Sequence, residues 1–501
     1  MMKLYSGLSL FGALTFFTVM SALSSELPGV FVIGDSISMH YGPFLEEGLR
    51  GDFLYDRKRD TEEEKGWADL DIAKGANGGN SRQVLAYLRD RLEKAPIQAD
   101  VLVFNCGLHD IRTDVATGRK QIPIAEYESN LREIIRVSEA MGLEPLWLNT
   151  CPVIDDVHNA KMSWHRYDKD VLAYNEVAEK VMEEHGVTVV DFYKFCARQL
   201  PEGLADHVHF KPEARSKQGE YLAGAIKQWW TACSRSSGLH HQRLWSQTPR
   251  GFETRGRERI NASFRVERVV DPELIFFPAA EPNTGTALIV FPGGGYIYLD
   301  FVDHVRKLAD RLNPEGVSVI GLKYRTKWPI DGADEGVPEI ALEDARRAVK
   351  LVRQSATQWG IDPRRIGVVG QSAGANLALQ LACHFDRGNL ETGDPVEQQS
   401  SRPDFVAVFS SWNFSKNESP FAFPSDAPPI FFRHARDDYS IGLAEVLVKQ
   451  FEEAGLRTDI RFLDSGGHGA FGLEPHHSGH AWPDELLRTL AGWGFYRPVT
   501  E

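Results

Sequence analysis

The chain has 501 residues, which is too long for a single hydrophobic core and indicates two or three domains. Hydrophobic residues make up 42% of it and charged residues 25%, so the composition excludes a disordered chain. The formal net charge of −14 argues against a nucleic-acid partner, because an acidic protein is repelled by phosphate, and favours a neutral or carbohydrate-like ligand.

The N-terminus has the layout of a secretory signal peptide. Lys3 is followed by an apolar run over residues 8–20 and then by the small-residue stretch from Ser21 to Ser24. The run is too short for a comfortable membrane span, and no later stretch is apolar enough to cross a bilayer. We expect residues 1–25 to be a removed signal peptide and the mature chain to be secreted or periplasmic, without a stable membrane span. An uncleaved anchor is the alternative.

The cysteines do not suggest a metal site. Cys106, Cys151, Cys196, Cys233 and Cys383 include no CxxC pair, so we expect no zinc, and the sequence gives no sign of another metal or of a cofactor. After export, one or two disulfides in the first half are compatible with the spacing, and so are buried free thiols.

Between residues 26 and 233, apolar strand-like runs alternate with longer amphipathic runs. The predicted strands are residues 30–34, 101–106, 145–149 and 187–192. The predicted helices are residues 81–92, 125–141, 168–185 and 212–232. This alternation is typical of a parallel sheet with helices on its faces, and it predicts a first α/β domain.

Several polar residues follow the apolar strands of this region. Ser36, in the tripeptide GDS, comes at the end of the first strand and opens a helix, where an open α/β sheet has its ligand crevice. Gly78, in the stretch NGGNS, offers a backbone N–H that can approach an oxyanion closely. Asp206 precedes His209 by three residues, a spacing at which a carboxylate can orient an imidazole.

In order and spacing, these blocks resemble the SGNH, or GDSL-type, hydrolases. The resemblance covers residues 26–233 and implies a flavodoxin-like, three-layer α/β/α domain. It implies that Ser36 is the nucleophile, His209 the general base and Asp206 its orienting carboxylate. An oxyanion hole would be formed by the backbone N–H of Ser36 and that of Gly78, with Gly79 as the alternative.

His109 departs from the family pattern, which carries Asn at this place in the block GLHD. An imidazole N–H can also donate to an oxyanion, so we interpret His109 as a substitute donor; altered activity is the alternative. His207 lies beside the last block but not at the family's position, and we expect it to pack or to face solvent.

Residues 234–265 interrupt the alternation. They are rich in Ser, Gly, Gln and Arg, and we expect a linker or an irregular strap over the second domain. Its arginines are expected to contact acidic surface of the same chain, in preference to an acidic polymer.

From residue 266 to residue 501 the alternation returns and predicts a second α/β domain. The predicted strands are residues 274–277, 287–291, 317–324, 366–369, 405–410, 429–434 and 459–463. The predicted helices are residues 301–312, 340–359, 373–384 and 443–454.

A second serine motif stands in this half. Ser372 lies in the GxSxG stretch GQSAG between a predicted strand and a predicted helix, which is the context that gives this motif meaning. Upstream, Gly294 and Gly295 belong to a triple-glycine loop that can aim backbone N–H groups at an acyl oxyanion. The backbone N–H of Ala373 would be the other donor.

The remaining partners follow in the order of the α/β-hydrolases. Asp438 comes after one predicted strand and His468 after the next, so the order is Ser, Asp, His. Asp437 is the alternative carboxylate, and His434 is expected to support the turn structurally.

This half resembles the α/β-hydrolase superfamily and, through the motifs FPGGGY, LKYR, DARRAVKLVR and WGIDPRRIGVVGQSAG, acetylxylan esterase-like proteins in particular. Pro292 stands where relatives of the hormone-sensitive-lipase type carry His, which favours the acetylxylan-esterase branch. The resemblance implies that Ser372 is the nucleophile, His468 the base and Asp438 its orienting carboxylate.

Together the resemblances imply an exported, two-site serine carboxylesterase that removes acetyl groups from a xylan-like polysaccharide or oligosaccharide through an acyl-enzyme. One alternative is that one domain, sooner the first, only binds carbohydrate. Another is a lipase, thioesterase or peptidase, whose acyl pocket could use the aromatic residues Tyr296, Tyr298, Phe301 and Trp328. The sequence leaves the oligomeric state open.

Overall fold

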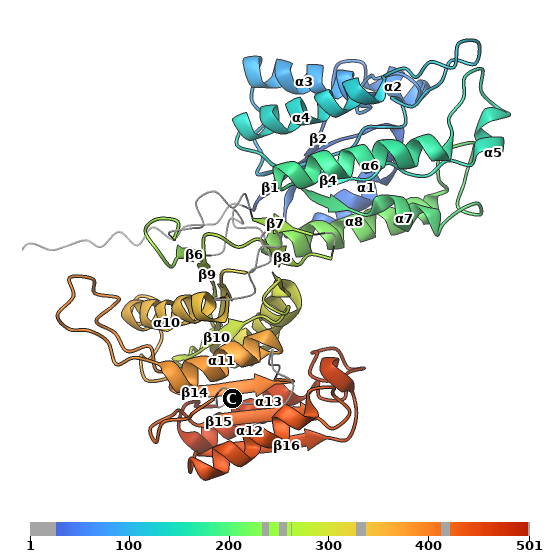
Figure 1. Ribbon diagram of the computed structural model, residues 1–501. Helices are drawn as coiled ribbons and strands as arrows, with labels where there is room; N and C mark the ends of the chain where they lie inside the picture. The colour runs from blue at the N-terminus through green and yellow to red at the C-terminus, as the bar shows by residue number, and fades with distance from the viewer. Residues whose placement is uncertain are drawn as a thin grey trace, which may run out of the picture.

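The computed structural model describes residues 27–232, 240–249, 258–261, 263–326, 337–411 and 421–498. The expected signal peptide and part of the expected strap lie outside the described residues. The chain forms two α/β regions, each built around its own large sheet (Figure 1). Within the described ranges, no helix combines the length and the apolarity that a bilayer crossing needs.

The first sheet has five strands in the order β2-β1-β3-β4-β5, all parallel. The strands are β1 (Gly29–Ile33), β2 (Leu54–Arg57), β3 (Val101–Phe104), β4 (Glu144–Leu148) and β5 (Thr188–Val190). This is the flavodoxin-like order, which confirms the predicted fold class. The central strands are almost wholly apolar because helices cover both faces.

The helices of this region lie in two layers (Figure 1). One layer contains α1 (Ser36–Leu49) and α8 (Pro212–Ala232), which pack on each other; the other contains α3 (Ser81–Lys94), α4 (Ile124–Ala140) and α6 (Asp168–His185). Three short helices lie in the connections: α2 (Glu63–Ala68), α5 (Asp155–Asn159) and α7 (Phe192–Ala197).

The second sheet has eight strands in the order β16-β15-β14-β13-β10-β12-β9-β6. The strands are β6 (His240–Arg243), β9 (Glu273–Phe277), β10 (Thr286–Phe291), β12 (Val317–Lys323), β13 (Ile366–Gln371), β14 (Phe405–Phe409), β15 (Ile430–Ala435) and β16 (Thr458–Leu463). All neighbours pair in parallel except at β9, which runs antiparallel to β12 and to β6. The expected strap therefore contributes an edge strand.

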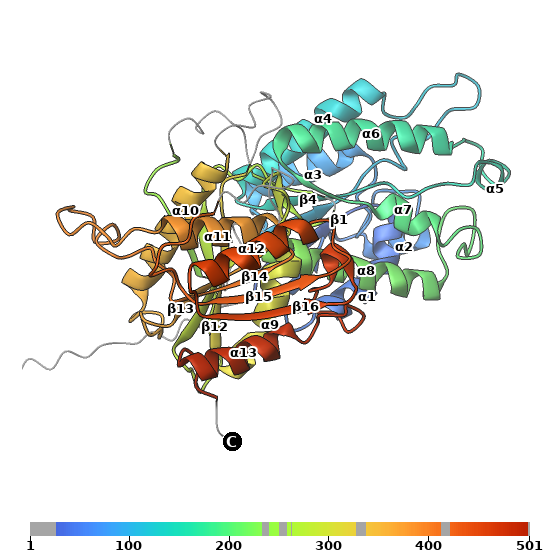
Figure 2. The ribbon, with the colours of Figure 1, turned by 60° about the horizontal axis from the view of Figure 1, so that its bottom comes forward.

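Helices also cover both faces of the second sheet (Figure 2). On one face lie α10 (Val337–Ser355), α11 (Ala373–His384) and α12 (Ile441–Glu453); on the other lie α9 (Lys307–Leu312) and α13 (Trp482–Trp493). A π-helical turn, η1 (Val302–Arg306), leads into α9. The remaining short elements are β7 (Arg259–Ile260), β8 (Val266–Glu267), β11 (Tyr298–Leu299), η2 (Asn313–Glu315) and η3 (Gly467–Gly469).

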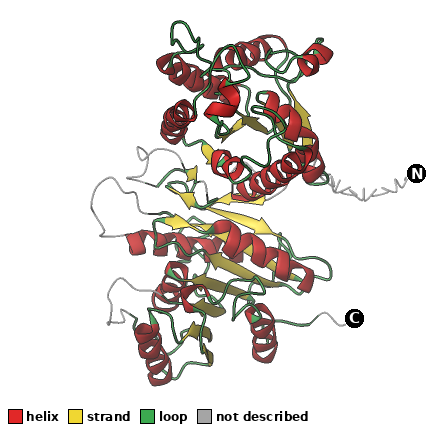
Figure 3. Ribbon diagram, turned by 90° about the vertical axis from the view of Figure 1, so that its right-hand side faces the viewer, coloured by secondary structure: helices red, strands yellow, loops and turns green. Residues whose placement is uncertain are grey.

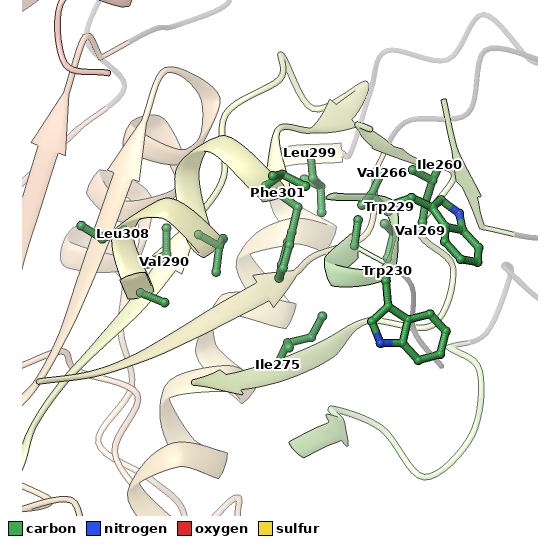
Figure 4. Close-up of a cluster of buried hydrophobic side chains, with 14 of the residues drawn as sticks. Trp229, Trp230, Ile260, Val266, Val269, Ile275, Val290, Leu299, Phe301 and Leu308 are labelled. Carbon is green, nitrogen blue, oxygen red and sulfur yellow. The ribbon is translucent and has the colours of Figure 1, made fainter. Parts of the chain in front are cut away.

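An apolar junction joins the two α/β regions, with the small three-stranded sheet β11-β8-β7 between them (Figure 3). Trp229 and Trp230, at the end of α8, are 2% and 7% exposed. They belong to one buried cluster with Ile260, Val266 and Val269 from the start of the second region (Figure 4). The two cores are therefore continuous.

Two arginines of the expected strap form ion pairs with acidic residues of the same chain. Arg259 contacts Glu183 of α6 at 2.7 Å, and Arg243 contacts Asp271 at 2.6 Å. Their partners are acidic residues of this chain, which agrees with the prediction.

Four cysteines fall in the described part of the chain, and all four are free thiols: Cys106, Cys151, Cys196 and Cys383. The sulfur atoms of Cys151 and Cys196 lie 3.2 Å apart, longer than a disulfide bond.

Candidate active sites

Ser36 lies at the first position of α1, directly beyond β1, and meets a histidine from the end of the region. Its Oγ is 2.9 Å from Nε2 of His209, 173 residues away in the sequence. Nδ1 of the same ring is 2.8 Å from Oδ2 of Asp206. Both contacts have hydrogen-bond length, so the three predicted residues form a continuous Ser–His–Asp relay.

Asp206 is held by three donors. Its Oδ1 accepts the backbone N–H groups of Val208 and His209, both at 2.8 Å. Burial alone would raise the pKa of Asp206, but the hydrogen bonds from the His209 ring and from these two amides outweigh it and hold the pKa well below its usual range. The carboxylate therefore stays ionised and can stabilise an imidazolium at His209.

Asp35 shapes the turn that presents Ser36. Its side chain caps α1 by accepting the backbone N–H of Ile37 at 2.9 Å. Burial raises the pKa of this carboxyl group. The tripeptide GDS thus supplies both the helix cap and the predicted nucleophile.

The glycine loop before α3 is internally hydrogen bonded. The N–H of Gly78, the predicted oxyanion donor, donates to the carbonyl of Gly34 at 2.7 Å. The N–H of the alternative, Gly79, donates to the Asn77 side chain at 2.9 Å. In this conformation neither amide is free to receive an oxyanion, and the Gly79 amide would need only a side-chain movement to become so.

His109 follows β3 and is 5% exposed. Burial, and then the positive charge of Arg166, lower the pKa of His109 to about 3. The ring is therefore neutral at ordinary pH and keeps one N–H donor. No hydrogen bond joins the ring to another residue in the described part of the chain, and the nearby His209 also contributes to lowering the pKa of His109. These properties suit the role of a substitute donor.

Three further histidines surround the first triad. The ring of His40 meets the edge of the His209 ring at 5.0 Å between centroids, and His207 lies 2.9 Å from His158 between Nδ1 atoms. His207 thus packs beside the triad, as expected. Sequence reasoning missed His40, although it stands four residues after Ser36 on the same face of α1. Among the described residues, no cluster of His, Cys, Asp and Glu has the arrangement of a metal site.

Ser372 occupies a strained turn between β13 and α11. Its φ and ψ are 55° and −120°, a conformation rarely adopted by residues other than glycine. The turn is crowded, because a Cβ on Gly374 would lie 1.9 Å from the carbonyl oxygen of Phe291. The small residues of GQSAG are therefore required for the nucleophile elbow.

The partners of Ser372 are also in place. Its Oγ is 2.9 Å from Nε2 of His468, and Nδ1 of that ring is 3.0 Å from Oδ2 of Asp438. Asp437, the alternative, instead accepts the backbone N–H groups of Gly466 and Gly467 at 3.0 and 2.7 Å. The geometry favours Asp438 as the carboxylate that orients His468, while Asp437 shapes the loop that carries this histidine.

The pKa of Asp438 lies well below its usual range. Burial alone would raise it, but the hydrogen bonds from His468 and from the backbone and side chain of Ser440 outweigh burial. His434 is fully buried with Nε2 3.7 Å from Asp438, which agrees with a supporting role.

The triple-glycine loop lies against the elbow. A Cβ on Gly293 would lie 3.2 Å from Cβ of Ser372. The N–H of Gly293 donates to Nδ1 of His304 at 2.9 Å. No acceptor is found among the described residues for the N–H groups of Gly294 and Gly295, which remain available together with that of Ala373 at the start of α11.

Sequence reasoning missed two residues of this site. His304 lies in the π-helical turn η1, a distortion that often marks functional positions. Tyr439 is 70% exposed, stacks on His468 and places its hydroxyl 3.2 Å from Nε2. Tyr439 directly follows Asp438, which is the one signal that could have drawn attention to it.

The aromatic residues considered for an acyl pocket belong mostly to the core. Tyr296 and Phe301 are 1% and 0% exposed, and the Tyr296 hydroxyl donates to Asn376 at 2.8 Å. Tyr298 lies beneath Arg265, and Trp328 lies outside the described residues. Beside the elbow there is instead a pocket of about 210 Å³, whose lining includes His304, Lys307, Phe471 and Glu474.

Comparison with known proteins divides the chain in the same way as the two triads. Residues 32–215 match the model of the GDSL-like lipase/acylhydrolase family, and residues 288–422 match that of the alpha/beta hydrolase fold. Each α/β region is thus similar to a different family of hydrolases. The first match includes all three residues of the Ser36 relay, whereas Asp438 and His468 lie beyond the end of the second.

Two curated relatives have names that refer to xylan. An acetylxylan esterase of Xylanibacter ruminicola is 30% identical over 246 residues, which are 44% of this chain and 47% of that protein. Endo-1,4-beta-xylanase B of Butyrivibrio fibrisolvens is 32% identical over 123 residues, 24% of this chain and 18% of that protein. The chain thus spans less than half the length of either relative.

A solved structure, the acetyl ester-xyloside bifunctional hydrolase from Caldicellulosiruptor lactoaceticus, is 26% identical. The match covers 52% of this chain and 97% of that one, with a TM-score of 0.42.

Proposed function

We propose that this chain removes acetyl groups from a polysaccharide such as xylan, at two serine sites centred on Ser36 and Ser372. The observation that carries the proposal is that each region holds a complete relay. The Ser–His and His–Asp contacts are 2.9 and 2.8 Å in the first and 2.9 and 3.0 Å in the second. The similarity to an acetylxylan esterase supports acetylated xylan as the substrate.

The proposal includes the expected domains and location. Residues 26–233 form the first esterase domain and residues 266–501 the second, with residues 234–265 as a strap between them. Export of the mature chain is supported by the signal-like residues 1–25 and by the accessibility of such a polymer outside the cell.

Both sites carry out the same chemistry. His209 or His468 takes the proton of the serine hydroxyl as Oγ attacks the acetyl carbonyl. The same imidazolium then gives that proton to the departing sugar oxygen as the ester C–O bond breaks, which leaves a sugar hydroxyl and an acetyl-enzyme. Water, activated by the histidine, attacks the acetyl-enzyme and releases acetate. The backbone N–H of Ser36 and the His109 ring would stabilise the first oxyanion; Gly294, Gly295 and Ala373 would stabilise the second.

One observation favours a second candidate function for the first domain. The amides of Gly78 and Gly79 are both hydrogen bonded in this conformation, and a histidine replaces the family's asparagine at position 109. Trp67 is 48% exposed and its ring lies 5.9 Å from His40, so it offers a sugar a stacking surface. The alternative is therefore a domain that binds carbohydrate without cleaving it.

The test compares the wild type with Ser36→Ala, Ser372→Ala and the double variant. Acetate release is measured from a small aryl acetate and from acetylated xylan. We expect each single variant to keep part of the activity and the double variant to lose all of it beyond background. If Ser36→Ala keeps the full wild-type rate on every substrate, the first domain is not an esterase and the carbohydrate-binding alternative stands. A long-chain ester and a peptide serve as controls for the reaction class.

A further inference from the structure

Two guanidinium groups lie on one indole ring beside the first triad. The central carbons of Arg112 and Arg166 are 4.1 and 4.5 Å from the ring centroid of Trp164. Within the described part of the chain, neither guanidinium forms an ion pair with a carboxylate. By contrast, the buried arginines Arg325 and Arg433 each have carboxylate partners.

Arg166 is the more deeply buried of the two, at 2% exposure. Its Nε donates to the carbonyl of Leu108 at 2.6 Å, but both terminal nitrogens lack an acceptor among the described residues. Burial lowers the pKa of Arg166 only to about 10, so the group remains charged at neutral pH. A buried charge without a counter-ion is unfavourable, and an anion at the terminal nitrogens would offset this cost.

The chain supplies little compensating charge at this point. Asp71 and Asp35 are the carboxylates whose charges act on Arg166, and neither reaches it as an ion pair. Asp35 is buried, which raises its pKa and opposes its ionisation, and its Oδ1 already accepts the N–H of Ile37. The terminal nitrogens of Arg166 are therefore left for an external partner.

The position of Arg166 ties such a partner to the Ser36 site. Leu108, which holds its Nε, directly precedes His109, and the Arg166 charge lowers the pKa of His109, His158 and His207. These histidines surround the triad. An anion bound to Arg166 would consequently lie beside an ester whose carbonyl is at Ser36.

We propose that Arg166, together with Arg112, binds the carboxylate of a sugar acid in the substrate of the first site. Ser36 would then act on acetylated saccharides that carry uronic acid residues, while Ser372 has no such requirement. A planar guanidinium matches a planar carboxylate through two parallel hydrogen bonds, and both guanidinium groups lie against the Trp164 ring. The inference rests on the proposed esterase function of Ser36 only for its catalytic part.

The first experiment measures binding alone. The Ser36→Ala, Ser372→Ala double variant is titrated calorimetrically with a glucuronic-acid-bearing xylo-oligosaccharide and with the neutral oligosaccharide of the same length. We expect the acidic ligand to bind at least about tenfold more tightly, with affinity falling as salt is raised. Arg166→Gln should abolish the preference and Arg112→Gln should reduce it. Arg119→Gln, which removes the same charge from the exposed end of the same loop, is the matched control and should keep it.

Equal binding of the two ligands, or a preference unchanged in both Arg166→Gln and Arg112→Gln, would overturn the proposal. Tighter binding of a sulfated oligosaccharide than of the carboxylated one would overturn the assignment of the anion as a carboxylate.

The second experiment measures turnover in the Ser372→Ala background, where only the first site acts. Arg166→Gln also removes the contact to Leu108 next to His109 and can lower activity on every ester. Arg112→Gln avoids this, because its guanidinium makes no hydrogen bond in the described part of the chain. We expect Arg112→Gln to lower kcat/KM for an acetylated acidic oligosaccharide several-fold more than kcat/KM for an aryl acetate. An equal loss on both substrates would overturn the specificity role. If the Ser372→Ala protein cleaves no ester at all, the esterase proposal for Ser36 fails, and the binding experiment still decides whether the anion site exists.

Discussion

At the scale of single residues, we propose that position 109 determines how well the first site can stabilise an oxyanion. The His109 ring is neutral, because its pKa is lowered to about 3, and it can donate one N–H as asparagine does. In the Ser372→Ala background we expect His109→Asn to stay within about tenfold of the parent. His109→Ala should lower kcat by about 10²–10³ with little change in KM, measured by acetate release.

His207→Ala is the control for this prediction. His207 lies in the same cluster of histidines but pairs with His158, so its loss should change kcat by less than tenfold. If His109→Ala keeps the parental kcat, His109 does not donate to the oxyanion.

Neighbouring aspartates separate two roles in the second site. Asp438 accepts from the His468 ring, whereas Asp437 accepts only from loop amides. In the Ser36→Ala background, Asp438→Asn should lower kcat on an aryl acetate by about 10⁴-fold, because an amide no longer holds the reactive tautomer. Asp437→Asn, the matched control, should lower kcat on the same ester far less. Equal losses would show that the orienting carboxylate is assigned wrongly.

The residues that sequence reasoning found and missed differ in how they are positioned. Ser36, Ser372 and His468 follow predicted strands, and His209 precedes a predicted helix. All four lie within recognisable motifs, so the neighbouring sequence identifies them. His304 enters its site through a π-helical turn and a single contact to the backbone of Gly293. Such a contact depends on tertiary packing and has no local pattern.

At the scale of elements, the central strands could be predicted because they are buried on both faces and read as apolar runs. The edge strands β2 and β6 could not. Their sequences, LYDR and HHQR, show neither an apolar run nor a clear alternation. An edge strand is held mainly by backbone pairing to one neighbour, which leaves little trace in side-chain composition.

Asp110 links two elements of the first region and makes its stability depend on pH. Both carboxyl oxygens lie within 3.1 Å of the N–H of Ser81, the first residue of α3. Burial raises the pKa of Asp110 from 3.8 to about 7. Between these two values the folded state keeps this proton, whereas the unfolded state has lost it. The contribution of Asp110 to the free energy of unfolding is therefore most favourable below about pH 4. It decreases as the pH rises to about 7 and is constant above that pH.

Asp110→Asn mimics the protonated form and should lack this decline. Both proteins are unfolded with urea at pH 5, 6 and 7.5. As the pH rises, the free energy of unfolding of the variant minus that of the wild type should increase, by at most about 1.4 kcal/mol per pH unit. Asp114→Asn is the matched control on the same loop, because the pKa of Asp114 is lowered by hydrogen bonds from Thr117 and the pH trend should not take the same sign. A difference between Asp110→Asn and the wild type that is constant across this range would contradict the buried, protonated carboxyl.

At the scale of the whole molecule, the sequence predicted two α/β domains with a strap between them, and both sheets are present. What the sequence could not show is that their cores join. The junction pairs Trp229, near the end of α8, with Val266 and Val269 in the same buried cluster, across the strap. From the sequence alone, apolar residues next to a polar segment cannot be assigned to one core or the other.

The continuous core predicts that the two regions unfold together. Each site reports on its own region: loss of activity in urea measures the first region in Ser372→Ala and the second in Ser36→Ala. We expect the two midpoints to coincide in the parent proteins. Trp229→Ala should lower stability by about 3–5 kcal/mol and separate the midpoints, because it opens a cavity at the junction and removes the contact that couples the regions.

Trp147→Ala is the matched control. This indole is fully buried in the core of the first region, where it packs against Phe104. It should destabilise the protein to a similar degree but leave the two midpoints together.

Glu183→Gln removes the half-exposed contacts to Arg259 and Arg268. It should lower the free energy of unfolding by less than about 1 kcal/mol, because exposed ion pairs contribute little. Midpoints that already differ in the parent proteins would show that the apolar junction does not couple the two regions.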